Sequence, residues 1–131
     1  MYGFAVGSYL PYNKETELIK FSNWSWESRS RYPYASSRIY YHAAVSKGGD
    51  FYVIGGDADG SATATIARYN TNTDTWTRLG DLVNARYYHD AIWSQDFLIV
   101  VGNNGAMMSE RCSLNGDSVV CVEQSPSVRY G

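Results

Sequence analysis

One stretch of this chain occurs twice. YYHAAVSKGGDFYVIGG, which begins at Tyr40, aligns without a gap with YYHDAIWSQDFLIVVGN, which begins at Tyr87. The paired residues, such as His42 and His89, are all 47 residues apart. Six of the pairs are identical: Tyr40, Tyr41, His42, Ala44, Val53 and Gly55 match Tyr87, Tyr88, His89, Ala91, Val100 and Gly102. A repeat at this spacing predicts consecutive copies of one supersecondary unit, each needing its neighbours to bury its apolar faces.

Each copy reads as four short strands, A to D, joined by turns. Strand A is YHAAV or YHDAI, and strand B is FYVIGG or FLIVVGN. Strand C is TATIARYN or MMSERCSL, and strand D is DTWTRL or DSVVCVE. Short β-rich segments bounded by Gly, Asn and Asp, without 3.6-residue periodicity, predict an antiparallel meander. The 12 tyrosines and 12 glycines agree with an all-β fold.

Charge and hydropathy exclude several classes of partner. The net charge is −2 and no run of Lys or Arg occurs, so the chain lacks the basic patch that binds nucleic acid or an anionic membrane. The longest apolar run, Phe97 to Val101, is far too short to span a bilayer. The N-terminus does not read as a signal peptide, so a secretion signal, if one exists, is expected outside this sequence.

Three motifs of the repeat resemble the kelch family. VIGG (53–56) is similar to its di-glycine after a hydrophobic strand, RYNTNTDTW (68–76) to its Tyr-turn-Trp hairpin, and ARYYH (85–89) to its Arg-x-x-His segment. The resemblance implies a β-propeller made of four-stranded antiparallel blades. The sequence departs from the pattern where the first copy shifts the Arg by one place, to Arg38, and where the third hairpin has Val119 instead of Trp.

The same pattern places the N-terminal part of the chain. YGFAVG (2–7) resembles FYVIGG, and LIKFSNWSW (18–26) resembles the Tyr-turn-Trp hairpin. We expect a partial blade of strands B to D over residues 1–30, complete blades over 31–80 and 81–124, and the approach to a further blade over 125–131. Propellers close with about 4–8 blades. The ring is therefore expected to be incomplete, with the missing blades supplied by a longer chain or by other copies.

The repeated histidines do not predict a metal site. Kelch sequences commonly carry His at this position, so repetition alone accounts for His42 and His89. Together with Cys112 and Cys121 the residue count suits zinc, but the eight residues between the cysteines do not fit a zinc-binding spacing, and strands A and C lie roughly 10 Å apart. DADG (57–60) lacks the later acidic ligands of a calcium loop. We expect no metal and no other cofactor.

The cysteines fit a disulfide better. If Asn115 pairs with Ser118 around a Gly116–Asp117 turn, Cys112 faces Cys121 at a non-hydrogen-bonded position, where Cα atoms approach to about 4.5 Å. One alternative is two free thiols in a reduced cytosolic protein. Another is an Asn115–Gly116 turn, which would shift the register.

A candidate N-glycosylation sequon stands at Asn23-Trp24-Ser25. With the cysteine pair it favours an extracellular location, and the chain resembles secreted kelch-type proteins that carry Cys pairs in their outer hairpins. A cytoplasmic location is the alternative.

We expect the chain to act without catalysis, as an extracellular protein-interaction or structural scaffold module. In a meander the B–C and D–A loops share one face, and here they are the longer loops. Tyr and Arg are favoured at interfaces. Arg38 and Arg86 have the alternative role of bridging neighbouring blades. The expected interaction face comprises Arg31, Tyr32, Tyr34, Arg38, Asp57, Asp59, Arg86, Asn103 and Asn104.

Two other functions stay open at this point. One is an intracellular kelch substrate adaptor. The other is the propeller part of an enzyme resembling galactose oxidase, a copper radical oxidase whose metal-binding Tyr, His and Cys motifs cannot be matched residue by residue in this sequence.

Overall fold

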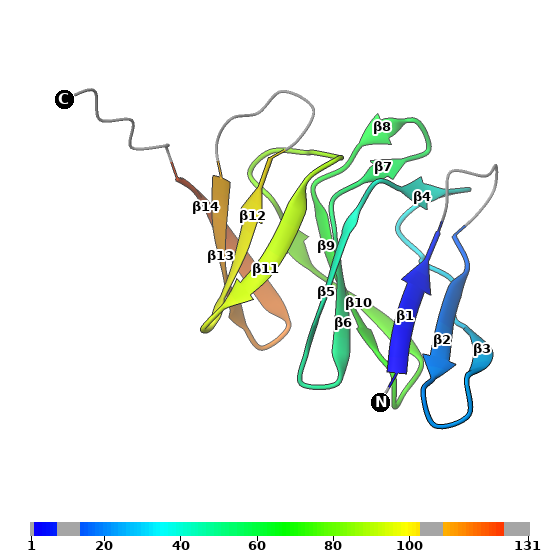
Figure 1. The fold of residues 1–131 in the computed structure, drawn as a ribbon. Helices are drawn as coiled ribbons and strands as arrows, with labels where there is room; N and C mark the ends of the chain where they lie inside the picture. The colour runs from blue at the N-terminus through cyan, green and yellow to red at the C-terminus, as the bar shows by residue number, and fades with distance from the viewer. Residues whose placement is uncertain (1, 8–13, 103–108, 125–131) are drawn as a thin grey trace.

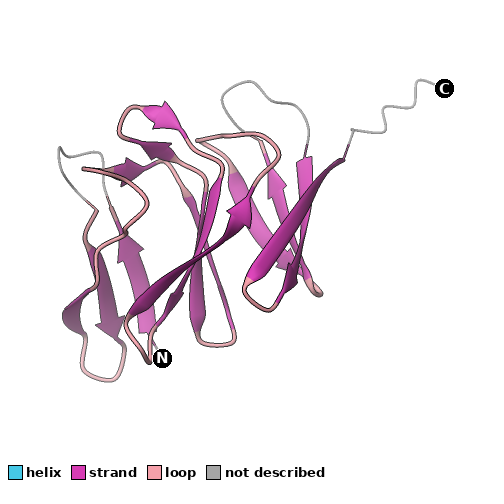
Figure 2. Cartoon of the chain, turned by 180° about the vertical axis from the view of Figure 1, so that it is seen from behind, coloured by secondary structure: helices cyan, strands magenta, loops and turns pink. Residues whose placement is uncertain are grey.

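The computed structural model describes residues 2–7, 14–102 and 109–124. These residues form strands and turns, with no helix among them (Figures 1 and 2). The all-β prediction is confirmed. Three antiparallel sheets lie one after another in chain order and do not close into a ring (Figure 1).

The first sheet has three strands and the other two have four. The first has the order β1 (Tyr2–Val6), β2 (Thr16–Lys20), β3 (Ser25–Arg29). The second has the order β10 (Thr75–Asp81), β9 (Thr65–Asn70), β6 (Asp50–Ile54), β5 (Ala43–Lys47). The third has the order β11 (Asp90–Ser94), β12 (Phe97–Val101), β13 (Ser109–Asn115), β14 (Ser118–Gln124). Each four-stranded sheet is a propeller blade in which every strand pairs with its neighbours along the chain.

A small fourth sheet forms at one end of the second blade. Its order is β4 (Ile39–Tyr40), β7 (Asp57–Ala58), β8 (Ser61–Ala62), so the connection before β5 pairs with the connection between β6 and β9. The sequence gives no period-2 pattern there. The pairing depends instead on Asp59 at the β7–β8 turn, whose carboxylate accepts from the backbone N–H groups of Ser36 at 2.6 Å, Ser37 at 2.8 Å and Arg38 at 3.1 Å.

The core lies between the sheets. Leu98, Val100 and Cys112 of the third sheet pack against Tyr52 and Ile54 of the second. A second buried cluster, around Tyr32, Val53 and Ala67, lies between the first and second sheets. Because each sheet buries apolar side chains on its neighbours, the sheets stabilise each other by removing apolar surface from water.

The di-glycine after β6 forms the joint between the second and third sheets. Gly55 has φ +59°, and a Cβ there would lie 2.8 Å from both the Arg86 carbonyl oxygen and His89 Cε1. Gly56 has φ +107°, and its Cβ would lie 2.8 Å from His42 Cβ. Both the backbone conformation and the close approach require glycine here. The repeated histidines, both half-buried, therefore pack against this joint.

Candidate interaction face

The loop end of the protein is formed by the connections that precede strand A and those that join strands B and C. In Figure 1 it is the upper edge, where β4, β7 and β8 lie. Asn103 and Asn104 of the expected interaction face lie outside the described residues. The other seven residues divide into a buried group and an accessible group.

Three of the expected contact residues are buried, which corrects their assignment to an interaction surface. Tyr32 has no exposed surface; its ring packs edge-on against Trp76 at 5.2 Å, and burial raises its pKa. Arg86 also has no exposed surface. Asp57 is buried and accepts from the Gly60 N–H at 2.7 Å. These connections fold back into the sheets, so their side chains contact the chain itself.

Arg86 ties two sheets together, the alternative role considered for it. Its guanidinium donates to the Glu110 carboxylate at 2.6 Å and to the Gly102 carbonyl at 3.1 Å, both in the third sheet. Its own carbonyl accepts from the Gly56 N–H at 2.8 Å, in the second sheet. Glu110 also accepts from the backbone N–H groups of Val83 at 2.6 Å and Asn84 at 3.1 Å. A buried ion pair with these extra hydrogen bonds fixes the connection after β10.

Four expected residues keep accessible surface. Arg31 is exposed and pairs with Glu15 at 2.5 Å, while Tyr34 is half-buried. Arg38 is half-buried, with its guanidinium 5.3 Å from the centre of the Tyr40 ring. Asp59 is exposed; desolvation opposes its ionisation, but hydrogen bonds from Ser36, Ser37 and Arg38 lower its pKa to about 2. Asp59 therefore orders the loop end as a permanent carboxylate.

The most prominent exposed feature of the loop end is a pair of tyrosines that the residue-by-residue assignment missed. Tyr41 and Tyr88 occupy the same repeat position, and their ring centres lie 4.0 Å apart. They expose 38% and 60% of their surface, and the Tyr88 N–H donates to the Tyr41 carbonyl at 3.2 Å. A hydrogen bond with the Tyr41 hydroxyl is the main reason that the pKa of Tyr88 is raised to about 12. The Tyr88 hydroxyl therefore stays a neutral hydrogen-bonding group at physiological pH.

Both tyrosines have a backbone conformation that bulky residues rarely adopt. The φ angle is 54° at Tyr41 and 57° at Tyr88, in the left-handed region. Such a conformation costs of order 1–3 kcal/mol and persists where the surroundings impose it, often at binding sites. Tyr40 and Tyr87 extend the group, with centroid distances of 4.5 Å between Tyr40 and Tyr41 and 5.2 Å between Tyr87 and Tyr88.

This tyrosine cluster, defined as Tyr40, Tyr41, Tyr87 and Tyr88, suits recognition of another protein. Tyr offers a large, rigid, amphipathic surface that loses little conformational entropy on binding. A signal for the cluster was present in the sequence, because the doubled Tyr-Tyr stands directly before strand A in both copies. Position alone does not reveal which ring of each pair is exposed.

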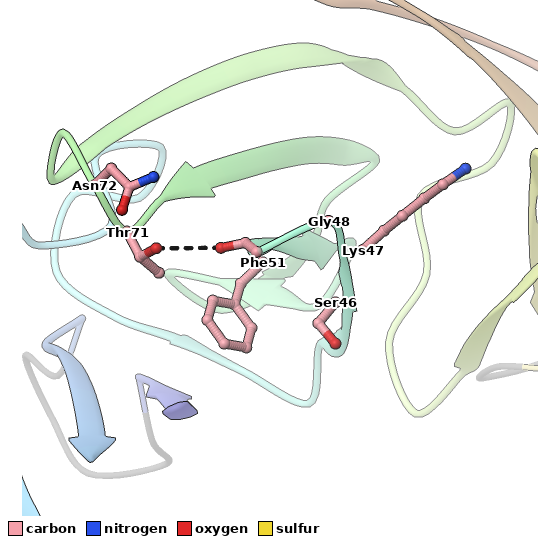
Figure 3. Close-up of a pocket in the computed structure, with 7 residues that line it drawn as sticks. Ser46, Lys47, Gly48, Phe51, Thr71 and Asn72 are labelled. Atoms are coloured by element: carbon pink, nitrogen blue, oxygen red, sulfur yellow. Dashed lines mark hydrogen bonds between the residues drawn. The ribbon is translucent and has the colours of Figure 1, made fainter. Parts of the chain in front are cut away.

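A hollow at the opposite end of the second blade is a weaker candidate. It has a volume of 480 Å³ and lies between the β5–β6 and β9–β10 turns, lined by Ser46, Lys47, Gly48, Gly49, Phe51, Thr71 and Asn72 (Figure 3). Thr71 Oγ1 donates to the Gly49 carbonyl at 3.2 Å across it. The Lys47 side chain points away, toward Asp96 at 3.6 Å and over the Trp93 ring at 4.5 Å (Figure 3). The residues that line this hollow therefore do not present a group of charged side chains to a ligand.

A smaller hollow of 160 Å³ separates the first and second sheets beside β5. It is lined by Phe4, Ala44, Val45, Ser46 and Phe51. The Phe4 and Phe51 rings stack at 4.5 Å. The first sheet has no strand A in the described part of the chain, and this hollow lies beside β1, the edge where such a strand would pair.

Cys112 and Cys121 face each other across β13 and β14 and form a disulfide with an S–S distance of 2.05 Å. The ladder pairs Asn115 with Ser118, so the turn is Gly116–Asp117. Glu110 brings a carboxylate within 4.8 Å of both sulfur atoms. The sulfur atoms are bonded to each other, and the Glu110 carboxylate already accepts hydrogen bonds. The atoms of these three residues that could bind a metal ion are therefore already engaged.

In the residues that the structure describes, no helix is both long and apolar enough to cross a membrane.

Comparison with known proteins assigns the repeat. The family model described as "Kelch motif" matches residues 38–83. The chain is 36% identical over 72 residues to Kelch-like protein 25 of Rattus norvegicus and of Homo sapiens. The match covers 55% of this chain but only 12% of those proteins. The Kelch motif over residues 38–83 and the four-stranded antiparallel blades agree, and the described residues form a kelch-type β-propeller segment whose ring is incomplete.

Proposed function

We propose that this propeller segment is a non-catalytic protein-interaction module whose partner binds at the loop end, centred on Tyr41 and Tyr88. The observation that supports it most is the closely packed, exposed tyrosine pair, held in a strained conformation at the same position of two blades. Arg38, whose guanidinium lies 5.3 Å from the centre of the Tyr40 ring, and Asp59 add opposite charges to the same loop end, which would orient a partner. Arg31 and Tyr34 extend the surface toward the first sheet.

We further propose that the module acts outside the cell as a scaffold. The Cys112–Cys121 disulfide supports this, since such bonds persist in oxidising compartments. An intracellular kelch substrate adaptor is the second candidate, favoured by the similarity to Kelch-like protein 25. Alkylation of free thiols in freshly isolated native protein separates the two: protection of both cysteines supports the extracellular scaffold, and labelling of both supports the adaptor.

Further blades are proposed partners of the same segment. The outer face of the third sheet exposes Ile92 by 57%, Val120 by 66% and Val122 by 44%. On the first sheet, Trp26 is 59% exposed, whereas Trp76, at the matching hairpin position, is half-buried against Tyr32. Apolar faces of this kind are covered by neighbouring repeats, from a longer chain or from other copies.

The binding face can be tested by comparing variants in one capture experiment. Biotinylated protein is incubated with extract of the source tissue, and bound proteins are quantified by mass spectrometry. We expect Tyr41→Ser with Tyr88→Ser to lose specific partners at least tenfold (about 1.4 kcal/mol per tenfold change). Gln95→Ala, at the β11–β12 turn on the opposite end, is the matched control and should retain them. Equal capture by both variants would refute the tyrosine-centred site.

A further inference from the structure

The β2–β3 turn presents its asparagine in a defined conformation. Lys20 and Ser25 form the last ladder pair, and Trp24 between them has φ 54°. Asn23 Oδ1 accepts from the Ser25 N–H at 3.1 Å and from the Ser25 hydroxyl at 2.6 Å. With the amide oxygen held toward Ser25, the amide nitrogen lies on the other side of the group. Asn23 is exposed.

The second sheet shows that this position stays accessible when blades pack. Its β9–β10 turn matches the β2–β3 turn, because Asn70 pairs with Thr75 and Asp74 has φ 55°. Thr73 therefore corresponds to Asn23, and its hydroxyl lies 2.7 Å from that of Thr75, as Asn23 contacts Ser25. Thr73 is exposed although the second sheet packs on the first. A further blade packed in the same way on the first sheet would leave Asn23 open to solvent.

Two partly exposed aromatic rings stand next to Asn23. Phe21 is 37% exposed and Trp24 is 71% exposed, and their ring centres are 5.5 Å apart. Phe21 opens the same four-residue turn, two residues before Asn23. A pyranose ring has an apolar face of C–H groups, which packs on an aromatic ring as other apolar groups do. A sugar attached to Asn23 would meet such a surface within its reach.

We propose that Asn23 carries an N-linked glycan whose first N-acetylglucosamine packs on the Phe21 ring. This inference rests on the extracellular part of the proposed function. The sugar donor is a lipid-linked oligosaccharide pyrophosphate. Transfer forms the bond between Asn23 Nδ2 and the anomeric carbon and breaks the bond from that carbon to the phosphate oxygen. Nδ2 loses a proton, and the lipid pyrophosphate leaves.

The site is tested in the full chain fused to a secretion leader and produced in eukaryotic cells. Peptides containing Asn23 are analysed by mass spectrometry before and after enzymatic deglycosylation in ¹⁸O water, which converts the glycosylated Asn to labelled Asp. We expect most Asn23 to be occupied. Ser25→Ala should abolish occupancy, whereas Thr75→Ala, the matching change in the second sheet, should leave it unchanged. Because peptides are measured, a poorly folding variant still gives a result.

The contact with Phe21 needs a second measurement. The unfolding midpoint is compared with and without the glycan, in the original chain and in Phe21→Ser. We expect removal of the glycan to lower the midpoint of the original chain by a few degrees and to leave that of Phe21→Ser unchanged, the signature of two coupled groups.

Each outcome is decisive for this site. Unmodified Asn23 in the leader-directed chain overturns the modification, and equal midpoint changes in both backgrounds overturn the Phe21 contact. Neither result bears on the native compartment, which the alkylation of native thiols decides separately.

Discussion

His89 Nε2 lies 2.7 Å from the carbonyl oxygen of Ile54, and this contact joins the start of the third sheet to the end of strand β6 in the second. A carbonyl can only accept, so the neutral ring carries its proton on Nε2. His89 Nδ1 is buried without a hydrogen-bond partner among the described residues. Protonating this ring would put a charge, with a second N–H to satisfy, into a closed joint.

The joint predicts loss of stability in acid. Burial, followed by the charge of His89, lowers the pKa of His42 to about 4, and burial also lowers the pKa of His89. The unfolded histidines take up protons near their ordinary pKa of about 6.5, before the folded ones do. The contribution of these histidines to the free energy of unfolding should therefore be fully present above about pH 6.5. It should be lost progressively toward pH 4, by on the order of 3 kcal/mol for His42. Urea denaturation at several pH values measures this, and His42→Asn should flatten the slope.

Gly55 should tolerate no side chain. In Gly55→Ala the Cβ meets Arg86 and His89, so we expect a loss of about 3 kcal/mol or more from strain and displacement of the joint. Gly102 is the matched control, because it occupies the same repeat position with φ +76° and open space around it. Gly102→Ala should cost only about 1–2 kcal/mol, for the left-handed backbone. Similar losses in chemical denaturation of the two variants would contradict the proposed importance of the joint.

Replacing only one partner of the Arg86–Glu110 ion pair should lower the free energy of unfolding strongly. Glu110→Gln leaves a buried guanidinium without its counter-charge, and we expect a loss of about 3–5 kcal/mol. Adding Arg86→Met to Glu110→Gln removes the uncompensated charge and should restore part of that loss. A double-mutant cycle of unfolding free energies measures the coupling. Strict additivity of the two changes would show that the pair is energetically independent.

The disulfide should act locally. Cys112 and Cys121 enclose a loop of about ten residues, so loop-closure entropy limits its contribution to roughly 2–3 kcal/mol. Replacing both with Ser should speed hydrogen exchange in β13 and β14, while β6 and β9 of the second sheet stay protected. Faster exchange across both sheets would mean that the bond supports the whole segment.

The end faces should drive association of the 131-residue chain. Sedimentation is expected to show oligomers or a concentration-dependent mass, because exposed apolar sheet faces are removed from water on contact. Val120→Lys and Val122→Lys place charges on the outer face of the third sheet and should shift the chain toward monomer. Thr77→Lys, on a strand that already has neighbours in the chain, is the control. A compact monomer of the original chain at all concentrations contradicts this expectation.

The sequence was most informative where structure is set locally. The blade meander follows from alternating apolar residues and turn residues, and the Asn-Gly-Asp sequence marks the β13–β14 turn, although only the Asn115–Ser118 pair decides between its two possible registers. Which side chains of the connections are buried could not be predicted from the local sequence. Tyr32 is buried because a Trp far along the chain, Trp76, packs on it, and Arg86 because Glu110 of the following sheet pairs with it.

The tyrosine cluster shows the same limit for exposed residues, because the local sequence does not predict which tyrosine rings are exposed. The doubled Tyr was visible at 40–41 and 87–88, but the left-handed backbone at Tyr41 and Tyr88 decides which rings are exposed. That conformation is imposed by the turn into strand A and by the hydrogen bond between the two tyrosines' backbones. A residue's own propensity would predict the opposite, since bulky side chains avoid this region.

The joint at Gly55 has a consequence for how such chains can grow. The second and third sheets each have a glycine at the end of strand B and a histidine before strand A, and Gly55 of the second receives His89 of the third, whereas Gly7 of the first sheet lies against Ile39. A duplication of the 47-residue span from Tyr40 to Arg86 would therefore add one copy of His42 and one of Gly55 in the right order. Every new boundary then contains a complete pair without a compensating change elsewhere. Blade number can change in a single genetic event, and the 47-residue spacing between Tyr40 and Tyr87 is consistent with such a history.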